Sequence, residues 1–224
     1  MPSSTGLHAV AVEVAAFLLA ATCPGCDEPG TLLCDRCRLT LVPAPLELRT
    51  PEGLRVRAAL PFEAVAARCI RRLKGEGETL LAHPLGAALA GVLLEELRED
   101  VRPVPVPTGS AAFRRRGYRV PELLIRRAGA VPRRVLRTVG VRTDQRGLGA
   151  RERTDNVRGS MRATRAGHGA EVVLVDDVVT TGATLDEASR ALRSAGFEVL
   201  SAVALAATPL HRGRTGHPWK TRRK

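Results

Sequence analysis

The chain of 224 residues is long enough for one sizeable hydrophobic core and a small appendage, and it contains no internal repeat or low-complexity segment. Aromatic residues make up only 3% of it, a composition that is typical of an ordinary soluble α/β domain. The formal charge of +12 is concentrated between Ala112 and Arg165, which hold sixteen arginines, four carboxylates and no lysine. This excess predicts attraction to polyanions such as pyrophosphate, nucleotides or nucleic acid; the alternative is an Arg-rich genome composition with solvated side chains.

The first apolar stretch, from Leu7 to Ala21, carries Glu13 and is shorter than the roughly 20 residues that a membrane-spanning helix needs. No basic region precedes it, which disfavours a signal peptide. We therefore expect a packing helix here, no membrane span and a cytoplasmic protein.

Two Cys-x-x-Cys pairs follow this stretch, Cys23 with Cys26 and Cys34 with Cys37. Each pair forms a tight turn that presents two thiolates, and together they supply the four ligands of a tetrahedral zinc site. Because sulfur fills all four positions, the predicted zinc is structural and has no open coordination site. A redox dithiol and two disulfides are the alternatives. The fifth cysteine, Cys69, is expected to be buried on a helix.

Proline-containing residues 43–51 connect the cysteine pairs to the main domain. There we expect a strand over 56–62, a helix over 62–73 that ends in Lys74-Gly75, and a long apolar helix over 80–97 that covers one face of a sheet. The predicted units are 1–48, an N-terminal helix with the four-cysteine element; 49–210, the main domain; and 211–224, a loose basic tail.

Residues 102–107 are expected to form a strand. Its prolines have no backbone N–H to donate to a neighbouring strand, which disfavours a central position in the sheet. The strand leads into a predicted loop over 108–117 at a carboxyl end of the sheet. The Arg forks and the glycine of this loop suit a pyrophosphate, and the residues concerned are Arg114, Arg115, Arg116 and Gly117.

A helix is expected through 123–125 and a strand over 135–139. The residues that follow, 142–157, are rich in glycine and charge and show no sheet pattern. They predict a mobile loop that could close over a ligand.

Residues 172–175 form an apolar run rich in β-branched side chains, which predicts a buried strand of a parallel sheet. Asp176 and Asp177 end this run, and apolar residues at helical spacing over 185–195 predict a helix that stops at Gly196. In an open α/β sheet, ligands bind beyond the carboxyl ends of the strands, where this Asp pair is expected to lie.

The turn between this strand and this helix predicts a phosphate site. Gly182 lets the backbone approach closely, while Thr180, Thr181, Thr184 and the N–H groups of the helix N-terminus would hold a phosphate without a lysine. The carboxylates suit a vicinal diol, and a phosphorylated ribose offers both groups. Surface solvation of the Asp pair and a magnesium site of another α/β fold are the alternatives.

This stretch resembles the phosphoribosyltransferase signature, in which an acidic pair holds the ribose hydroxyls of phosphoribosyl pyrophosphate and a Thr-Thr-Gly-x-Thr loop holds its 5′-phosphate. Other motifs precede this stretch in the order of the ComF family. They are four cysteines, a Val-Pro-Val-Pro strand with Arg-Arg-Gly-Tyr, Gln145-x-x-Leu148 and Glu152-Arg153-x-x-Asn156-Val157. That family consists of competence-associated proteins with a zinc-ribbon head. The resemblance covers roughly residues 15–207 and implies an α/β fold: a type I phosphoribosyltransferase-like parallel sheet flanked by helices, with a small N-terminal zinc-ribbon-like element.

The resemblance also implies roles for individual residues. It places Gln145, Arg153 and Asn156 in a flexible hood and makes Asp176, Asp177 and Arg153 candidates for catalysis; taken singly, the hood residues could equally well only cap and staple a loop. The pyrophosphate loop would hold Arg114, Arg115, Arg116 and Gly117, and the ribose-phosphate loop would hold Asp176, Asp177, Val178, Val179, Thr180, Thr181, Gly182, Ala183 and Thr184. Arg119 stands where the family usually has Asn, and Met161 where a Phe is usual.

An enzyme of this kind would displace pyrophosphate from C1 of the sugar, with Mg²⁺ bridging the pyrophosphate and the ribose hydroxyls. No motif marks the acceptor. The expected partners are phosphoribosyl pyrophosphate or a related ligand and, because the family is associated with DNA uptake, single-stranded DNA and DNA-uptake proteins.

The main alternative is a non-catalytic single-stranded DNA-binding competence factor that uses the Arg-rich segment. That segment contains only Phe113 and Tyr118 as possible stacking residues, which weighs against it. A nucleotide-sensing regulator that binds RNA is a third possibility, for which no residue pattern speaks.

Overall fold

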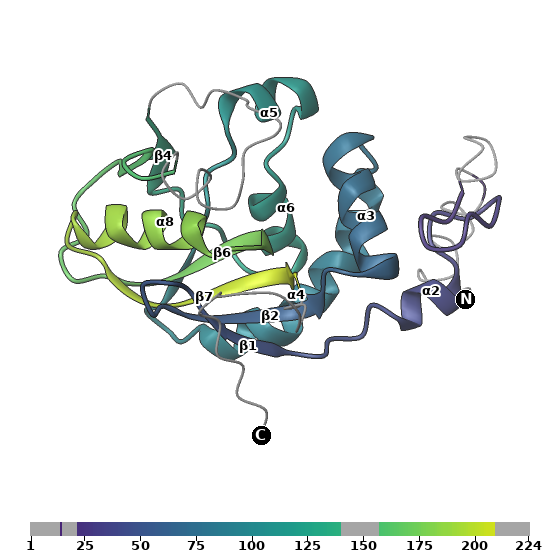
Figure 1. Cartoon of the computed structure of the whole chain (residues 1–224), viewed down its shortest axis with the longest axis horizontal. Helices are drawn as coiled ribbons and strands as arrows, with labels where there is room; N and C mark the ends of the chain where they lie inside the picture. The colour runs from purple at the N-terminus through teal and green to yellow at the C-terminus, as the bar shows by residue number, and fades with distance from the viewer. Residues whose placement is uncertain (1–13, 15–21, 140–156, 209–224) are drawn as a thin grey trace, which may run out of the picture.

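The computed structural model describes residues 14, 22–139 and 157–208 of the chain. These residues form a five-stranded sheet with helices on both faces and a separate two-stranded sheet (Figure 1). In spatial order the strands of the larger sheet are β1 (Leu46–Arg49), β2 (Arg55–Pro61), β7 (Glu198–Ala207), β6 (Glu171–Val179) and β3 (Arg102–Pro105). The last four are parallel, and β1 is an antiparallel edge strand. The expected parallel sheet flanked by helices is therefore confirmed, with β1 making the sheet mixed.

The apolar run over 172–175 forms the first part of central strand β6, and each of its four residues is at most 1% exposed. The strand does not end at Val175, as the sequence suggested, but continues through the Asp pair to Val179. The reason lies in its neighbours. Pairing with β3 stops at Val175, opposite Pro105, whereas pairing with β7 continues as far as Val179.

The proline-rich strand β3 lies at the edge of the sheet, where strand prolines are tolerated. Its outer side is covered by the connection that follows α6, since the carbonyl of Pro103 accepts a hydrogen bond from the N–H of Arg133 at 2.8 Å. The expectation that prolines exclude this strand from the centre is confirmed.

Helices cover the sheet in two layers (Figure 1). One layer holds α3 (Ala64–Gly75), α4 (Ala82–Glu96, preceded by the 3₁₀ turn η1, Thr79–Leu81) and α6 (Val120–Arg127). The other holds α8 (Ala183–Arg193) together with the two-stranded sheet of β4 (Leu136–Thr138) and β5 (Met161–Ala163). Each layer buries its own apolar cluster against one face of β6 and β7, which accounts for the unbroken apolar sequence of the central strands.

The predicted loop over 108–117 is wrong for most of its length, because Ser110–Arg116 form helix α5. Ala111 and Ala112 favour a helix, and three arginines in its last turn interact favourably with the negative end of the helix dipole. Gly117 ends the helix in the left-handed conformation at φ 79°, and its N–H bonds the carbonyl of Phe113 at 2.8 Å.

Several predicted features lie outside the described residues. These are the packing helix over 7–21 apart from Val14, the hood residues Gln145, Arg153 and Asn156, and the basic tail over 211–224. Within the described ranges, no helix is both long enough and apolar enough to cross a membrane.

Candidate functional site

Asp176 and Asp177 lie in β6 just beyond the point where its pairing with β3 ends, and each is only 9% exposed. Successive side chains of a strand point to opposite faces of the sheet. Val175 packs in the cluster beneath α3, α4 and α6, whereas Leu174 packs in the cluster beneath α8. By this alternation Asp177 lies on the α3 side of the sheet and Asp176 on the α8 side.

Lys74, at the carboxyl end of α3, is the charged partner of the Asp pair. Its Nζ lies 2.7 Å from Oδ1 of Asp177, and both side chains are largely shielded from solvent. Lys74 belongs to none of the sequence motifs that predict a function. Its rarity was the available signal, since Lys74 is one of only three lysines in a chain rich in arginine.

The surroundings of Asp176 oppose its ionisation. Burial raises the pKa of Asp176 to about 7, the nearby Asp177 carboxylate adds to the increase, and Lys74 acts against it. The backbone N–H of Asp177 also donates to Oδ1 of Asp176 at 2.8 Å, which favours the ionised form. Near neutral pH this carboxyl group can therefore hold a proton or, once ionised, accept hydrogen bonds from hydroxyls or bind a cation.

The turn after β6 aims backbone N–H groups at the same end of the strand. Gly182 adopts φ 80°, a left-handed conformation that glycine takes without strain, and α8 begins directly after it. The hydroxyl of Thr181 accepts a hydrogen bond from the N–H of Ala183 at 3.4 Å. Of the three predicted phosphate-binding threonines, Thr180 is exposed and Thr181 and Thr184 are half-buried. This arrangement is suited to an anion.

The segment after α5 is fastened to the end of α3 that carries Lys74. The hydroxyl of Tyr118 donates a hydrogen bond to the carbonyl of Leu73, the residue before Lys74. The predicted pyrophosphate residues thus belong to a segment attached beside the Asp pair, although among the described contacts none joins Arg114, Arg115 or Arg116 to either carboxylate. Nε of Arg116 is buried and has no hydrogen-bond partner in the described part of the chain.

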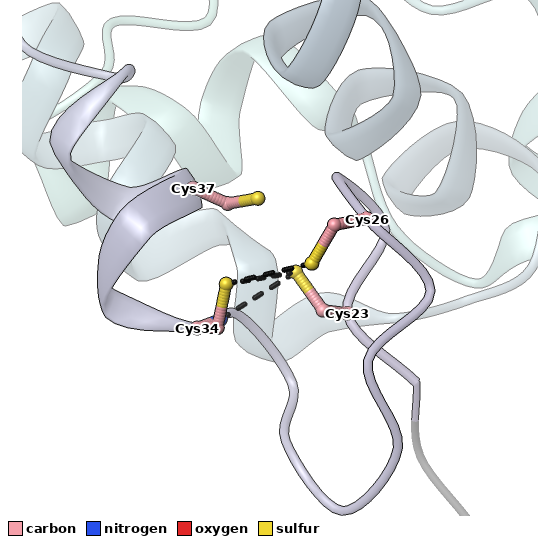
Figure 2. Close-up of side chains that lie close together, drawn as sticks. All are labelled: Cys23, Cys26, Cys34 and Cys37. Atoms are coloured by element: carbon pink, nitrogen blue, oxygen red, sulfur yellow. Dashed lines mark hydrogen bonds between the residues drawn. The ribbon is translucent and has the colours of Figure 1, made fainter.

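The four cysteines converge as the sequence predicted, with all four Sγ atoms within 4.8 Å of one another (Figure 2). Sγ of Cys34 lies 3.7 Å from Sγ of Cys23 and 3.6 Å from Sγ of Cys26. Zn–S bonds of about 2.3 Å in a tetrahedron would separate the sulfurs by about 3.8 Å, so this donor set fits zinc. All five cysteines are free thiols, and Cys69 is buried as expected.

Charge and hydrogen bonding within the four-cysteine cluster differ from one thiol to the next. For Cys23, burial opposes ionisation, but backbone N–H groups including that of Cys34 outweigh it and lower its pKa to about 7. Burial and the other thiols raise the pKa of Cys37. Arg36 lies beside Cys26, whose thiolate raises the pKa of the Arg36 guanidinium. A bound zinc ion would stabilise all four thiolates.

The four-cysteine element is attached to the outer side of α3 (Figure 1). Arg72 donates to the carbonyl of Thr22 at 3.0 Å, and Arg68 donates to the carbonyl of Gly25 at 3.2 Å. A Cβ added at Gly25 would overlap the side chain of Cys37. Helix α3 therefore touches the four-cysteine element along its side and the Asp pair at its carboxyl end.

Comparison with known proteins identifies related sequences. A family model described as "Phosphoribosyl transferase domain" matches residues 77–222. Competence protein F of Haemophilus influenzae is 33% identical over 111 residues, which cover 46% of this chain and 48% of that protein, so in this match the chain spans about half the length of its relative. DNA utilization protein YhgH of Salmonella typhi is 28% identical over 203 residues, which cover 83% of this chain and 84% of that protein.

Among solved structures, adenine phosphoribosyltransferase from Rhodothermus marinus DSM 4252 is 17% identical and has a TM-score of 0.38, with 77% of this chain and 98% of that chain covered. The family model and the two named relatives confirm the resemblance to phosphoribosyltransferases and to the ComF family that the sequence indicated.

Proposed function

The chain belongs to the phosphoribosyl transferase domain family, and from this we propose that it binds phosphoribosyl pyrophosphate or a ribose 5-phosphate moiety, with magnesium, at the carboxyl end of β6. The observation that carries the proposal is the buried pair Asp176 and Asp177, followed at once by the left-handed Gly182 turn and the N-terminus of α8. The names of two relatives, Competence protein F and DNA utilization protein YhgH, support a role of this chain in competence or DNA utilization.

Each part of the proposed site matches one part of the ligand. Ionised Asp176 and Asp177 accept hydrogen bonds from the 2′- and 3′-hydroxyls, and Lys74 fixes the position of Asp177. The hydroxyls of Thr180 and Thr181 and the first N–H groups of α8 hold the 5′-phosphate. When bound, Mg²⁺ would supply positive charge that offsets the charge of the pyrophosphate, and the carboxylates of Asp176 and Asp177 would help to hold it.

The proposed reaction is displacement of pyrophosphate from C1 of the ribose by an acceptor. The C1–O bond breaks, the pyrophosphate leaves with the electron pair, and a bond from C1 to the acceptor forms. The Asp pair stabilises positive charge that develops on the ring, and Arg114, Arg115 and Arg116 stabilise the departing pyrophosphate. Nε of Arg116 is buried and has no partner among the described residues, which supports this assignment, because such a donor is costly unless a ligand satisfies it. Arg153 of the hood is the further proposed catalytic residue.

Calorimetric titration of the zinc-loaded chain with phosphoribosyl pyrophosphate tests the proposal. Binding is expected to require Mg²⁺ and to fall roughly a hundredfold or more when Asp176→Asn and Asp177→Asn are combined, since both diol acceptors lose their charge. The matched control combines Glu99→Gln with Asp100→Asn, two exposed acids after α4, and should bind like the wild type. Absence of binding by the wild type, or equal binding by the Asp pair variant, would refute the proposal.

The second candidate function is binding of single-stranded DNA through the end of α5. Arg114 and Arg115 are exposed there, and neither has an ion-pair partner in the described part of the chain. The guanidinium of Arg119 lies 4.1 Å from the centroid of the Phe113 ring, so that a cation and an aromatic face occur side by side. These features favour contact with a phosphate backbone.

Replacing Arg114, Arg115 and Arg116 with alanine tests the DNA-binding function. Affinity for a single-stranded oligonucleotide, measured by fluorescence anisotropy, is expected to fall roughly tenfold or more with a shallower salt dependence, because fewer counterions are released on binding. A variant with the same loss of charge at three exposed arginines elsewhere, Arg126, Arg137 and Arg162, is the control. Equal affinity of the two variants would exclude α5 as the DNA-binding surface.

A further inference from the structure

A cavity of about 660 Å³ opens at the amino end of β3. The Asp pair lies in the neighbouring parallel strand β6, beyond the carboxyl end of β3. Three segments distant in sequence line the cavity: residues 94–103, which run from the end of α4 into the start of β3, the connection over 129–134, and Arg165 after β5. Its volume lies within the range of roughly 300–1,000 Å³ that small-molecule sites occupy.

Among the residues that the structure describes, five arginines and no acidic residue line this cavity: Arg98, Arg102, Arg133, Arg134 and Arg165. Arg134 donates from Nε to Glu122 at 2.7 Å and is thereby partly neutralised. For the other four, no side-chain hydrogen bond or ion pair is formed with any residue that the structure describes. Uncompensated charges of one sign around a concave surface focus a positive potential there, so the cavity attracts a multiply charged anion.

Backbone hydrogen bonds hold the arginine-bearing segments in place. The N–H of Arg133 bonds the carbonyl of Pro103 at 2.8 Å, and the N–H of Val101 bonds the carbonyl of Arg98 at 3.1 Å. Thr164, next to Arg165, bonds the carbonyl of Val135 at 2.9 Å. The charges therefore project from a fixed frame, which lowers the entropy lost on binding.

The rest of the cavity wall is apolar. Leu94 is 51% exposed and Val131 is 77% exposed, and Leu97, Val101 and Pro132 line the same cavity. An inorganic anion would leave these side chains in contact with water. A ligand with a flat ring beside its negative charges would cover them, and arginine guanidinium planes also stack on such rings.

The cavity is separate from the proposed ribose-phosphate site. Arg102 is paired with Val172 at the start of β6, and Asp176 lies four residues further along the same strand. At about 3.3 Å per residue this corresponds to roughly 13 Å along the sheet. The Arg cluster and the Asp pair can therefore hold two ligands at once.

We propose that this cavity binds a nucleotide, with the phosphates among Arg98, Arg102, Arg133 and Arg165 and the base against Leu94 and Val131. The same chemistry occurs in a free nucleoside triphosphate and in the 5′-phosphorylated end of a single strand. The free nucleotide fits the observations better, because the cavity has the volume of a small-molecule site.

Calorimetry with adenosine triphosphate as the probe tests this site on the full zinc-loaded chain that carries Asp176→Asn and Asp177→Asn, which removes the charge of the proposed ribose-hydroxyl acceptors. Combined Arg102→Gln and Arg133→Gln are expected to lower the affinity roughly tenfold or more, since two unpaired cations of the cavity are lost. Combined Arg126→Gln and Arg162→Gln change the net charge equally at exposed positions outside the cavity and should leave the affinity within about twofold.

Titrations with the separate parts of the nucleotide and with an oligonucleotide complete the test. Adenosine triphosphate should bind roughly tenfold tighter than either adenosine or inorganic triphosphate, because it occupies both the apolar wall and the arginines. A 5′-phosphorylated oligonucleotide that binds more tightly still, in dependence on Arg102 and Arg133, would support the site and identify a strand end as its ligand. Equal losses in the two arginine pairs, or equal affinity for inorganic triphosphate and the nucleotide, would overturn the proposal. These outcomes do not depend on binding of phosphoribosyl pyrophosphate.

Discussion

Replacing Lys74 with methionine is expected to weaken magnesium-dependent binding of phosphoribosyl pyrophosphate roughly a hundredfold at pH 7, as measured by calorimetry. Lys74 donates to Asp177 at 2.7 Å and is the described cation that acts against the raised pKa of Asp176. Without this cation two adjacent, largely buried carboxylates remain, so the pair retains a proton. Asp177 also loses the ion pair that fixes its position.

The effect of Lys74→Met should depend on pH. The pKa of Asp176 is about 7 in the folded chain, above its ordinary value, so protonated Asp176 stabilises the fold at low pH and this stability is lost as the pH rises through about 7. In the variant the pKa lies higher still. Ligand affinity should therefore recover toward about pH 9, while the difference in melting temperature between variant and wild type widens over the same range.

Lys74→Arg is the matched control, since it keeps a cation at the end of α3 and should retain most of the affinity. Tighter binding by Lys74→Met would show instead that Lys74 occupies the place of the magnesium ion. A pH-independent loss of affinity would mean that Lys74 contributes through packing alone.

Removal of zinc is expected to unfold the four-cysteine element and lower the melting temperature by roughly 10 °C or more, because structural zinc contributes several kcal/mol to a domain with little core of its own. Within residues 22–41 the buried apolar residues are Cys23, Leu33, Cys37 and Leu41, of which two are proposed zinc ligands. Metal analysis should find about one zinc ion per chain, and hydrogen exchange after chelation should increase first in this element and along α3.

Two cysteine substitutions distinguish the loss of zinc from other effects of the chelator. Cys37→Ser should release the metal and reproduce the exchange pattern, since it removes one of four ligands. Cys69→Ala changes a buried cysteine whose raised pKa, about 12, results mainly from burial, and it should keep the full zinc content. Full zinc content in Cys37→Ser would contradict the assignment of the ligands.

Local chemistry made much of this protein predictable. The β-branched run over 172–175, the Thr-Thr-Gly turn and the amphipathic stretch after it are contiguous, so their periodicity predicted β6, the turn and α8 closely. The prolines of β3 predicted its place at the edge of the sheet, because proline has no backbone N–H to bond a neighbouring strand. This signal also lies within the strand's own residues. The spacing of the cysteines predicted their convergence.

The errors arose where local signals compete. The glycines and arginines of 108–117 suggested a loop, yet the alanines preceding the arginines favour a helix, and Gly117 ends that helix rather than opening a loop. The charge of the Asp pair predicts that β6 ends at Val175, but the strand continues to Val179. Pairing with β7, which carries the strand on to Val179, cannot be seen in the residues of β6 themselves.

By itself, then, the sequence determined β6, the Gly182 turn and α8 of the proposed ribose-phosphate site, the four-cysteine set and the excess of arginine, because each depends on residues close together in the chain. Only the tertiary structure decided that Lys74 meets Asp177 across 103 positions and that arginines from three separate segments surround one cavity. It also decided that Asp176 titrates near neutral pH. Burial and electrostatic interactions act through space, so these properties follow from which elements pack together and not from their order in the chain.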